Sequence, residues 1–182
     1  MITLLFCLFV FALAAQAVAS ARWYDATGSQ SRGREGSGLR SPAPLPASKT
    51  VTDLNRGLAH TPMRGLGLIL VQEGRRRNVS PYLIAAIAGL ESSYGAAPCR
   101  SNTRNVWGLA SCKRGYGIPI FRSWRQAIRF QAGLLRRGWL SKGVRDVYTI
   151  GRSYCPPCGN KWGADVGWFM RDLGGTTKVT YR

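Results

Sequence analysis

The stretch Pro81-Tyr-Leu-Ile-Ala-Ala-Ile-Ala-Gly-Leu-Glu-Ser-Ser-Tyr-Gly95 decides the fold of this chain. Ser80 precedes it as the expected N-cap, proline stands at the first helical position, and glycine is favoured just beyond a helix end. The stretch therefore predicts a helix from Pro81 to about Tyr94. Its inward face would carry an apolar stripe that includes Leu83, Ile84, Ile87 and Leu90.

Further helical patterns on both sides indicate a mainly α domain over residues 63–175. Ser123 is a second expected N-cap. Residues 96–122, rich in Gly, Ser, Asn, Pro and Cys, show no helical period. They are expected to form an irregular loop or a small β-containing lobe between helices. The other expected helices cover residues 66–77, 123–138, 144–150 and 162–173.

The chain begins with two segments of different character. Residues 1–21 are almost wholly apolar and end in small residues, which is typical of a signal peptide for secretion or for export to the periplasm or cell envelope. No Lys or Arg precedes the apolar run, so an uncleaved N-terminal anchor stays an alternative; no later segment is expected to cross a membrane. Residues 22–62, rich in Ser, Gly, Pro and Arg, predict a disordered linker, and residues 176–182 a tail.

Four cysteines follow the signal segment, and an even number in an exported chain suggests two disulfides. Of the three possible pairings, Cys99–Cys112 with Cys155–Cys158 is preferred because each bond closes a local loop. A zinc site at Cys155-Pro-Pro-Cys158 is disfavoured, since the other cysteines lack close spacing and His60 is the only histidine. No metal and no cofactor are expected.

The 182-residue chain carries 26 Lys and Arg against 8 Asp and Glu, a net charge of +18. Such a charge attracts polyanions: nucleic acid, anionic lipid or the acidic polymers of a bacterial envelope. Nucleic acid is not an expected partner, because no predicted helix gathers base-reading side chains and the chain is expected to be exported. Anionic wall polymers stay candidates, and the run Arg75–Arg77 could grip them. Charge thus gives a class of partner and not an activity.

Glu91 carries the clearest chemical signal. It lies four residues after Ile87 and seven after Ile84, and so shares the inward face of its helix. Partial burial disfavours the charged carboxylate, and the negative end of the helix dipole acts in the same direction. Both effects raise the pKa, which suits a carboxylic acid that protonates a leaving oxygen in glycoside cleavage. The alternative is a glutamate paired with one of the many arginines.

Polar and aromatic residues near Glu91 suit a carbohydrate-binding site. Ser93 and Tyr94 follow the acid directly, and the irregular segment then supplies Asn105, Trp107 and Gly108. An amide can bind sugar hydroxyl or acetamido groups, and a flat indole can lie on a pyranose face. All five are predicted to bind substrate; a plain core position is the alternative for Trp107.

The segment Ala85-Ala-Ile-Ala-Gly-Leu-Glu-Ser-Ser-Tyr-Gly95, followed by Asn105-Val-Trp-Gly-Leu109, resembles the lysozyme-like superfamily. It looks most similar to the bacterial lytic transglycosylases and the related peptidoglycan glucosaminidases. The resemblance implies a lysozyme-like α-helical fold with Glu91 as catalytic acid and peptidoglycan glycan strands as substrate. Tyr154 matches a late tyrosine that in this family lies near the catalytic glutamate, so it is the second expected catalytic residue.

The distribution of acids bears on the mechanism. No Asp or Glu lies between Glu91 and Asp146, so the irregular segment offers no second carboxylate of the kind most glycosidases use. Asp146 and Asp165 are the remaining candidates, and each can also be read as a helix cap or ion-pair partner. A lone acid suits the transglycosylase reaction, in which Glu91 first protonates the MurNAc–GlcNAc bond and then acts as base. The alternatives are an N-acetylglucosaminidase or muramidase that uses water, and a non-enzymatic cationic envelope-binding or antimicrobial protein.

Overall fold

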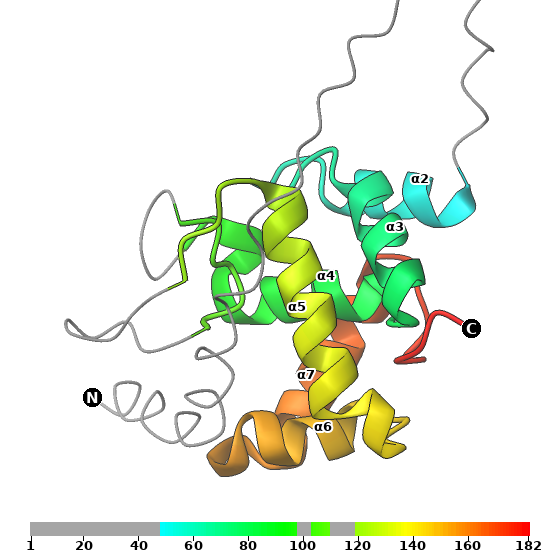
Figure 1. Cartoon of the computed structure of the whole chain (residues 1–182), viewed down its shortest axis with the longest axis vertical. Helices are drawn as coiled ribbons and strands as arrows, with labels where there is room; N and C mark the ends of the chain where they lie inside the picture. The colour runs from blue at the N-terminus through cyan, green and yellow to red at the C-terminus, as the bar shows by residue number, and fades with distance from the viewer. Residues whose placement is uncertain (1–47, 98–102, 110–118) are drawn as a thin grey trace, which may run out of the picture.

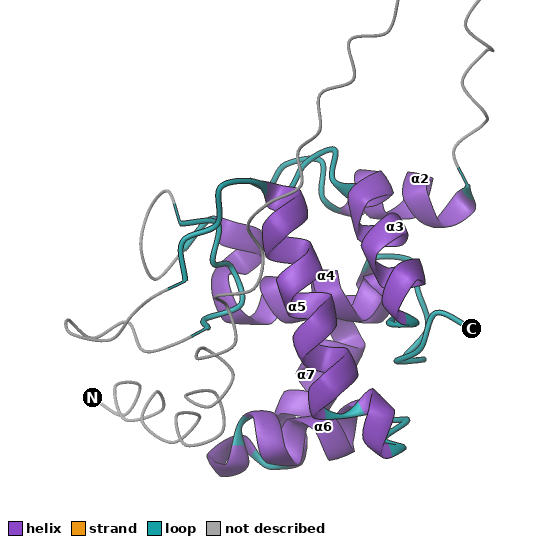
Figure 2. Cartoon of the chain, viewed as in Figure 1, coloured by secondary structure: helices purple, strands orange, loops and turns teal. Residues whose placement is uncertain are grey.

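The computed structural model describes residues 48–97, 103–109 and 119–182 (Figure 1). These residues are mainly helical and include no strand (Figure 2), which confirms the mainly α prediction. The expected signal peptide lies outside the described residues. Among those residues, no helix is both long enough and apolar enough to cross a membrane. The α-helices are α2 (Lys49–Gly57), α3 (Gly67–Arg77), α4 (Pro81–Ser92), α5 (Trp124–Gly138), α6 (Val147–Tyr154) and α7 (Asn160–Asp172), with 3-10 turns η2 (Ser93–Gly95), η3 (Leu140–Lys142) and η4 (Pro156–Cys158).

Helix α4 forms the centre of the core. Every side chain from Leu83 to Ala88 is completely shielded from solvent, because α3, α5 and α7 all contact this helix (Figure 1). Each fully buried Leu or Ile contributes about 1.5–3 kcal/mol relative to an exposed one. Gly89 lets the chain that follows fold back closely: a Cβ there would lie 2.7 Å from the Tyr94 ring. The deciding stretch therefore sets the position of the helices around it.

The predicted linker was wrong for residues 48–62. Ser48 caps α2 by accepting a hydrogen bond from the backbone of Val51, and Leu54 and Leu58 are completely buried. Polar residues outnumber apolar ones in α2, but the few apolar side chains share one face, which packs against α3. Residues 22–47 of the predicted linker lie outside the described residues.

The predicted tail was also wrong, because residues 176–182 pack on the domain. Val179 is buried, and its carbonyl accepts a hydrogen bond of 2.8 Å from the backbone N–H of Ser80. Ser80 is the N-cap of α4, as predicted, although its hydroxyl makes no capping bond. The folded domain thus extends beyond residues 63–175 at both ends.

The remaining helices largely follow the prediction. Ser123 caps α5, accepting a 3.1 Å hydrogen bond from Gln126 N–H. The helix expected over residues 144–150 instead begins at Val147, because Asp146 caps it through the backbone N–H of Thr149 at 2.8 Å. In the irregular segment, residues 103–109 and 119–122 form no helix or strand, and the predicted Cys99–Cys112 bond lies outside the described residues.

An ionic cluster ties α3 to α5. The Glu73 side chain is completely shielded from solvent, largely by arginine side chains that are themselves partly exposed. Burial alone would raise the pKa of Glu73, but hydrogen bonds from Arg129 and Arg125 outweigh it and hold the pKa below its usual value. The guanidinium-to-carboxylate distances are 3.0 Å for Arg125, 3.2 Å for Arg129, 3.3 Å for Arg77 and 3.8 Å for Arg76.

Glu73→Gln should lower the free energy of unfolding by about 2 kcal/mol at neutral pH, because the guanidiniums would then repel one another around a neutral amide. A depressed folded-state pKa adds stability above the unfolded value, 4.5, and this stability is lost as the pH falls through the folded pKa. The variant should therefore lose less stability than the wild type in acid. Urea unfolding measures both effects. Asp165→Asn, which breaks only an exposed pair with Lys161, is the control; equal losses in the two variants would contradict the assignment.

Candidate active site

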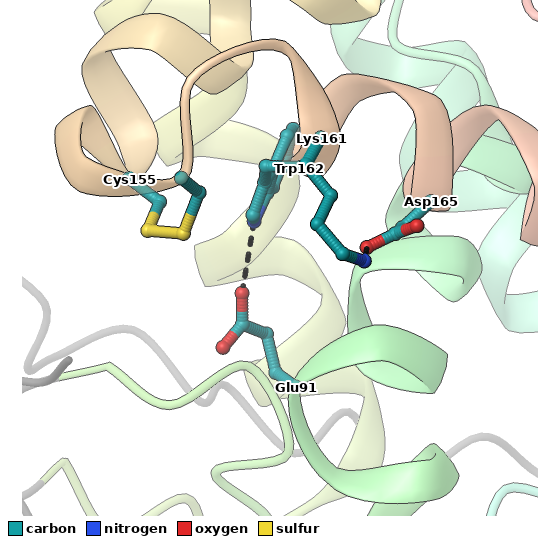
Figure 3. The surroundings of a disulfide bond; sticks show 6 residues. Glu91, Cys155, Lys161, Trp162 and Asp165 are labelled. Carbon is teal, nitrogen blue, oxygen red and sulfur yellow. Dashed lines mark hydrogen bonds and ion pairs between the residues drawn. A yellow bond between two sulfur atoms is a disulfide. The ribbon is translucent and has the colours of Figure 1, made fainter. Parts of the chain in front are cut away.

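Glu91 lies in the last turn of α4 and faces the start of α7. Its carboxyl Oε1 accepts a hydrogen bond of 3.1 Å from the indole N–H of Trp162 (Figure 3). The Glu91 side chain is open to solvent, whereas Trp162 is almost completely buried. The acid is thus held from the protein side by a fixed donor and stays reachable from outside.

Two opposing effects act on the Glu91 carboxyl. Burial among surrounding protein atoms raises its pKa, and the hydrogen bond from Trp162 lowers it; burial prevails, so the net shift is upward. The Glu91 side chain is thus open to solvent on one side, while protein atoms on its other sides displace water from the carboxyl. No cation among the described residues forms an ion pair with Glu91. The arginine-pairing alternative therefore does not apply to this part of the chain.

Tyr154 supports the donor from beneath. Its ring stacks on Trp162 with centroids 4.7 Å apart, and its hydroxyl donates a 3.2 Å hydrogen bond to the carbonyl of Trp107. Burial, and then the charge of Glu91, raise the pKa of Tyr154 far above its usual value. The phenol is therefore neutral, close to Glu91 as expected, and occupied by a protein acceptor. This geometry makes Tyr154 a positioning residue rather than a group that transfers protons.

A short disulfide-closed turn connects the two elements that supply these aromatic rings. Cys155 directly follows Tyr154 at the end of α6, and the predicted disulfide from Cys155 to Cys158 is formed, with the Cα atoms 5.3 Å apart. Helix α7 begins two residues after Cys158 and presents Trp162 in its first turn. Figure 3 shows the disulfide on one side of the Trp162–Glu91 bond and the Lys161–Asp165 ion pair on the other. The turn thereby limits how far α6 and α7 can separate.

Trp107 and Asn105 have structural roles, which corrects their predicted contact with sugar. The Trp107 ring is 1% exposed, and its indole donates a 2.8 Å hydrogen bond to the carbonyl of Ile84 inside the core. A ring in that position has no face for a pyranose, so the core alternative is the correct one. Asn105 is equally buried; its amide donates to the carbonyl of Leu109 at 2.6 Å and accepts from the same residue's N–H at 3.1 Å.

The chain reverses sharply just after Glu91. Ser93 and Tyr94 both have left-handed backbone conformations, with φ of 50° and 58°, which cost free energy for residues other than glycine. Tyr94 turns inward: its hydroxyl is buried without a hydrogen-bond partner among the described residues, and burial followed by the charge of Asp172 raises its pKa to about 12. Tyr94 therefore does not present its hydroxyl to a ligand, whereas Ser93 is exposed beside the acid.

Ser92 fastens this reversal to the 103–109 segment. Its buried hydroxyl lies 2.7 Å from the carbonyl of Val106 and 3.1 Å from that of Ala88, and accepts a 2.9 Å bond from the N–H of Gly95. Gly108 is thereby brought next to the acid: a Cβ on Gly108 would lie 3.5 Å from Glu91 Oε2. Of the five predicted substrate-binding residues, Gly108 and Ser93 are exposed, and Gly108 is the one that lies beside the carboxyl of Glu91.

The two other candidate acids have structural partners. Asp146 caps α6 and accepts from the Thr149 hydroxyl at 2.8 Å; the backbone hydrogen bond from Thr149 is the main reason that the pKa of Asp146 is lowered. Asp165 pairs with Lys161 at 2.5 Å. Neither acid appears among the groups that shift the pKa of Glu91. In the described part of the chain, the Glu91 carboxyl therefore has no carboxylate partner.

The described residues contain no cluster of His, Cys, Asp or Glu that could hold a metal ion. Two surface hollows among the described residues are lined by residues other than Glu91. One, of about 580 Å³, is lined by Ala59, His60, Thr61, Pro62 and Arg64. The other, of about 450 Å³, is lined almost entirely by arginines.

Comparison with known proteins finds no family model that matches the chain and no curated protein that matches its sequence.

Sequence reasoning assigned no role to Trp162 or Ser92. Trp162 lies 71 residues from the acid it binds, and Ser92 bonds to a carbonyl 14 residues away. Local periodicity carries no information on such distant contacts. The only local signals are the position of Ser92 beside the acid and that of Trp162 just after the Cys155–Cys158 turn.

Trp162→Phe should raise the pKa of Glu91 further, because the ring is retained while the donor that stabilises the carboxylate is lost. A pH titration of the Glu91 carboxyl carbon by NMR measures this shift. Trp168→Phe is the control, since Trp168 is 55% exposed and lies on the same helix; it should leave the titration unchanged. An unaltered Glu91 pKa in the Trp162 variant would refute the hydrogen bond.

Ser92→Ala should lower the free energy of unfolding by about 2 kcal/mol, because it leaves the carbonyl of Val106 and the N–H of Gly95 without a partner at a buried site. Urea unfolding provides the measurement. The exposed neighbour offers a matched control: Ser93→Ala should change stability by no more than about 0.5 kcal/mol. Similar values for the two serines would show that the Ser92 contacts do not hold the loop.

Proposed function

We propose that this chain is a peptidoglycan-cleaving glycosidase of lysozyme-like fold, acting as a lytic transglycosylase on the MurNAc–GlcNAc strand. The observation that supports it most is the state of Glu91: a solvent-reachable carboxyl with a raised pKa and no carboxylate partner among the described residues. Such a group keeps its proton to higher pH than an ordinary glutamate and can deliver it to a glycosidic oxygen. The resemblance of residues 85–95 and 105–109 to lytic transglycosylases points to the same chemistry.

The proposed reaction uses Glu91 twice. Glu91 first donates its proton to the glycosidic oxygen, the bond from C1 to that oxygen breaks, and the substrate's own acetamido group stabilises the positive charge at C1. The resulting Glu91 carboxylate then removes the proton from the 6-hydroxyl of the same sugar, whose oxygen bonds to C1. The product is a 1,6-anhydro sugar, no water is consumed, and Glu91 ends protonated again.

The surrounding residues support both halves of this cycle. The Trp162 N–H stabilises the carboxylate form that exists between the two steps, and burial favours the acid form that begins them. Because the two effects oppose each other, neither form of Glu91 is strongly trapped. Gly108, beside the carboxyl, and the exposed Ser93, two residues after the acid, are the positions where substrate would first meet the protein.

Hydrolysis is the second candidate, and the exposure of Glu91 favours it. A water molecule that reaches the carboxylate could replace the 6-hydroxyl in the second step, which would give a muramidase or N-acetylglucosaminidase. The two reactions differ in their products. Secretion or localisation in the periplasm or cell envelope, by way of residues 1–21, remains part of the proposal.

Digestion of purified peptidoglycan, with mass analysis of the products, tests both the activity and its type. The proposal expects anhydro-muramic ends; reducing ends would identify the hydrolase instead. Glu91→Gln should abolish cleavage without unfolding the protein, whereas Asp165→Asn should leave the rate unchanged. In the wild type, the rate should fall as the pH rises through the Glu91 pKa, since the acid form is required. A Glu91→Gln protein that still cleaves would overturn the role given to Glu91, whereas a wild type that releases no fragments would overturn the enzyme assignment and favour a binding protein.

A further inference from the structure

The ends of two helices and the last residue of the chain meet in one basic hollow. It is lined by Arg75, Arg76, Arg77, Asn78, Arg136 and Arg182, has a volume of about 450 Å³, and is called the arginine hollow below. Asn78 ends α3 in a left-handed conformation, and its side-chain oxygen accepts a 3.0 Å hydrogen bond from the backbone N–H of Arg182. Figure 1 shows the C-terminus beside the end of α3. The tail therefore completes this hollow.

The arginine hollow has a large excess of positive charge. Of its arginines, Arg76 and Arg77 contact Glu73, whose one carboxylate is also shared with Arg125 and Arg129 outside the lining, so this pair keeps an excess of at least one positive charge. Arg75, Arg136 and Arg182 form no ion pair with any described residue and add three more. Arginines near helix C-termini interact favourably with the negative end of the helix dipole. That interaction requires neither a shared hollow nor a contribution from the C-terminal residues.

The composition of the lining indicates which anion fits. All its charged groups are guanidiniums, which bind phosphate oxygens through paired N–H donors, and Asn78 adds an amide. No aromatic or large apolar side chain lines the hollow. The exposed large apolar residues of the described chain are Leu68, Ile120, Tyr148 and Trp168, and none of them is in the lining. The hollow thus lacks the stacking platform that suits nucleic-acid bases and the apolar wedge that suits a bilayer.

We propose that the arginine hollow binds the phosphodiester groups of an anionic wall polymer, such as a poly(glycerol phosphate) chain attached to peptidoglycan. This inference rests on the proposed function in one respect, namely that the protein works on bacterial wall. A site that binds such a polymer, formed by the ends of α3 and α5, would keep the protein on its substrate between cleavage events. It takes part in no bond making or breaking.

Co-sedimentation of the catalytically silenced Glu91→Gln protein with intact sacculi measures binding without cleavage. The sacculi are used with their poly(glycerol phosphate) attached and after its chemical removal. In this background, the combined substitutions Arg75→Gln, Arg136→Gln and Arg182→Gln should weaken binding to polymer-bearing sacculi about tenfold, since each exposed charge pair contributes modestly. The matched control, Arg64→Gln, Arg122→Gln and Arg171→Gln, removes the same charge from exposed positions outside the hollow and should retain most of the affinity.

Further probes separate this inference from the other polyanions and from the proposed function. Soluble poly(glycerol phosphate) should compete for wall binding, and added salt should weaken it. Equal losses in the two triple variants, equal binding to stripped sacculi, or stronger competition by DNA or by phosphatidylglycerol vesicles at matched phosphate would each overturn the inference. Without the Glu91 substitution, the hollow variant should still cleave stripped peptidoglycan at the wild-type rate. A wild-type protein that binds the polymer but does not cleave peptidoglycan would refute the proposed enzyme activity and leave the polymer-binding inference standing.

Discussion

The structure depends on one constraint, the complete burial of the central part of helix α4. Because Leu83 to Ala88 have no exposed surface, this part of the helix has no solvent face, and α3, α5 and α7 all contact the helix. A helix enclosed in this way can carry a charge only where it leaves the core. Glu91 occupies that place, in the last turn, and Ser92 then anchors the reversal that follows. The acid therefore inherits a fixed backbone from the packing of the core, which is what a group that must meet a substrate in one geometry requires.

Local chemistry made the centre of this fold predictable from sequence. Proline at the helix start, an unbroken apolar run and a terminal glycine lie within one short stretch, so the bounds of α4 and the position of Glu91 follow from neighbours along the chain. The same holds for the start of α5, where the Ser123 hydroxyl caps the backbone. The raised pKa of Glu91 was also predictable, since burial on an apolar helix face is a local property. Local reasoning failed at α2, where mostly polar residues conceal the few apolar ones that reach the core.

The rest of the site could not be derived in this way because distant segments build it. Trp107 was predicted to stack on a sugar, but its ring lies in the core, where its indole N–H bonds to the carbonyl of Ile84. The residues next to Trp107 in the sequence do not reveal this core position. Trp162 became the partner of Glu91 only through the packing of α7 on α4. In both cases the indole N–H bonds to an acceptor far away in the sequence, and this is decided by the assembled core rather than by residue pattern. The residues supporting an acid are therefore harder to predict than the acid itself.

The contrast between Glu73 and Glu91 shows how a strongly basic chain can hold one carboxyl with a lowered pKa and another with a raised pKa. Glu73 and Glu91 lie on consecutive helices, and burial opposes the charged form of both. Four arginines reach Glu73 and hold its pKa low; Glu91 receives a single neutral indole donor, and its pKa stays raised. An arginine in place of Trp162 would keep Glu91 ionised and remove its ability to donate a proton. In the described part of the chain, no arginine or lysine forms an ion pair with Glu91. A strongly basic surface and a carboxyl with a raised pKa therefore occur together in one small domain.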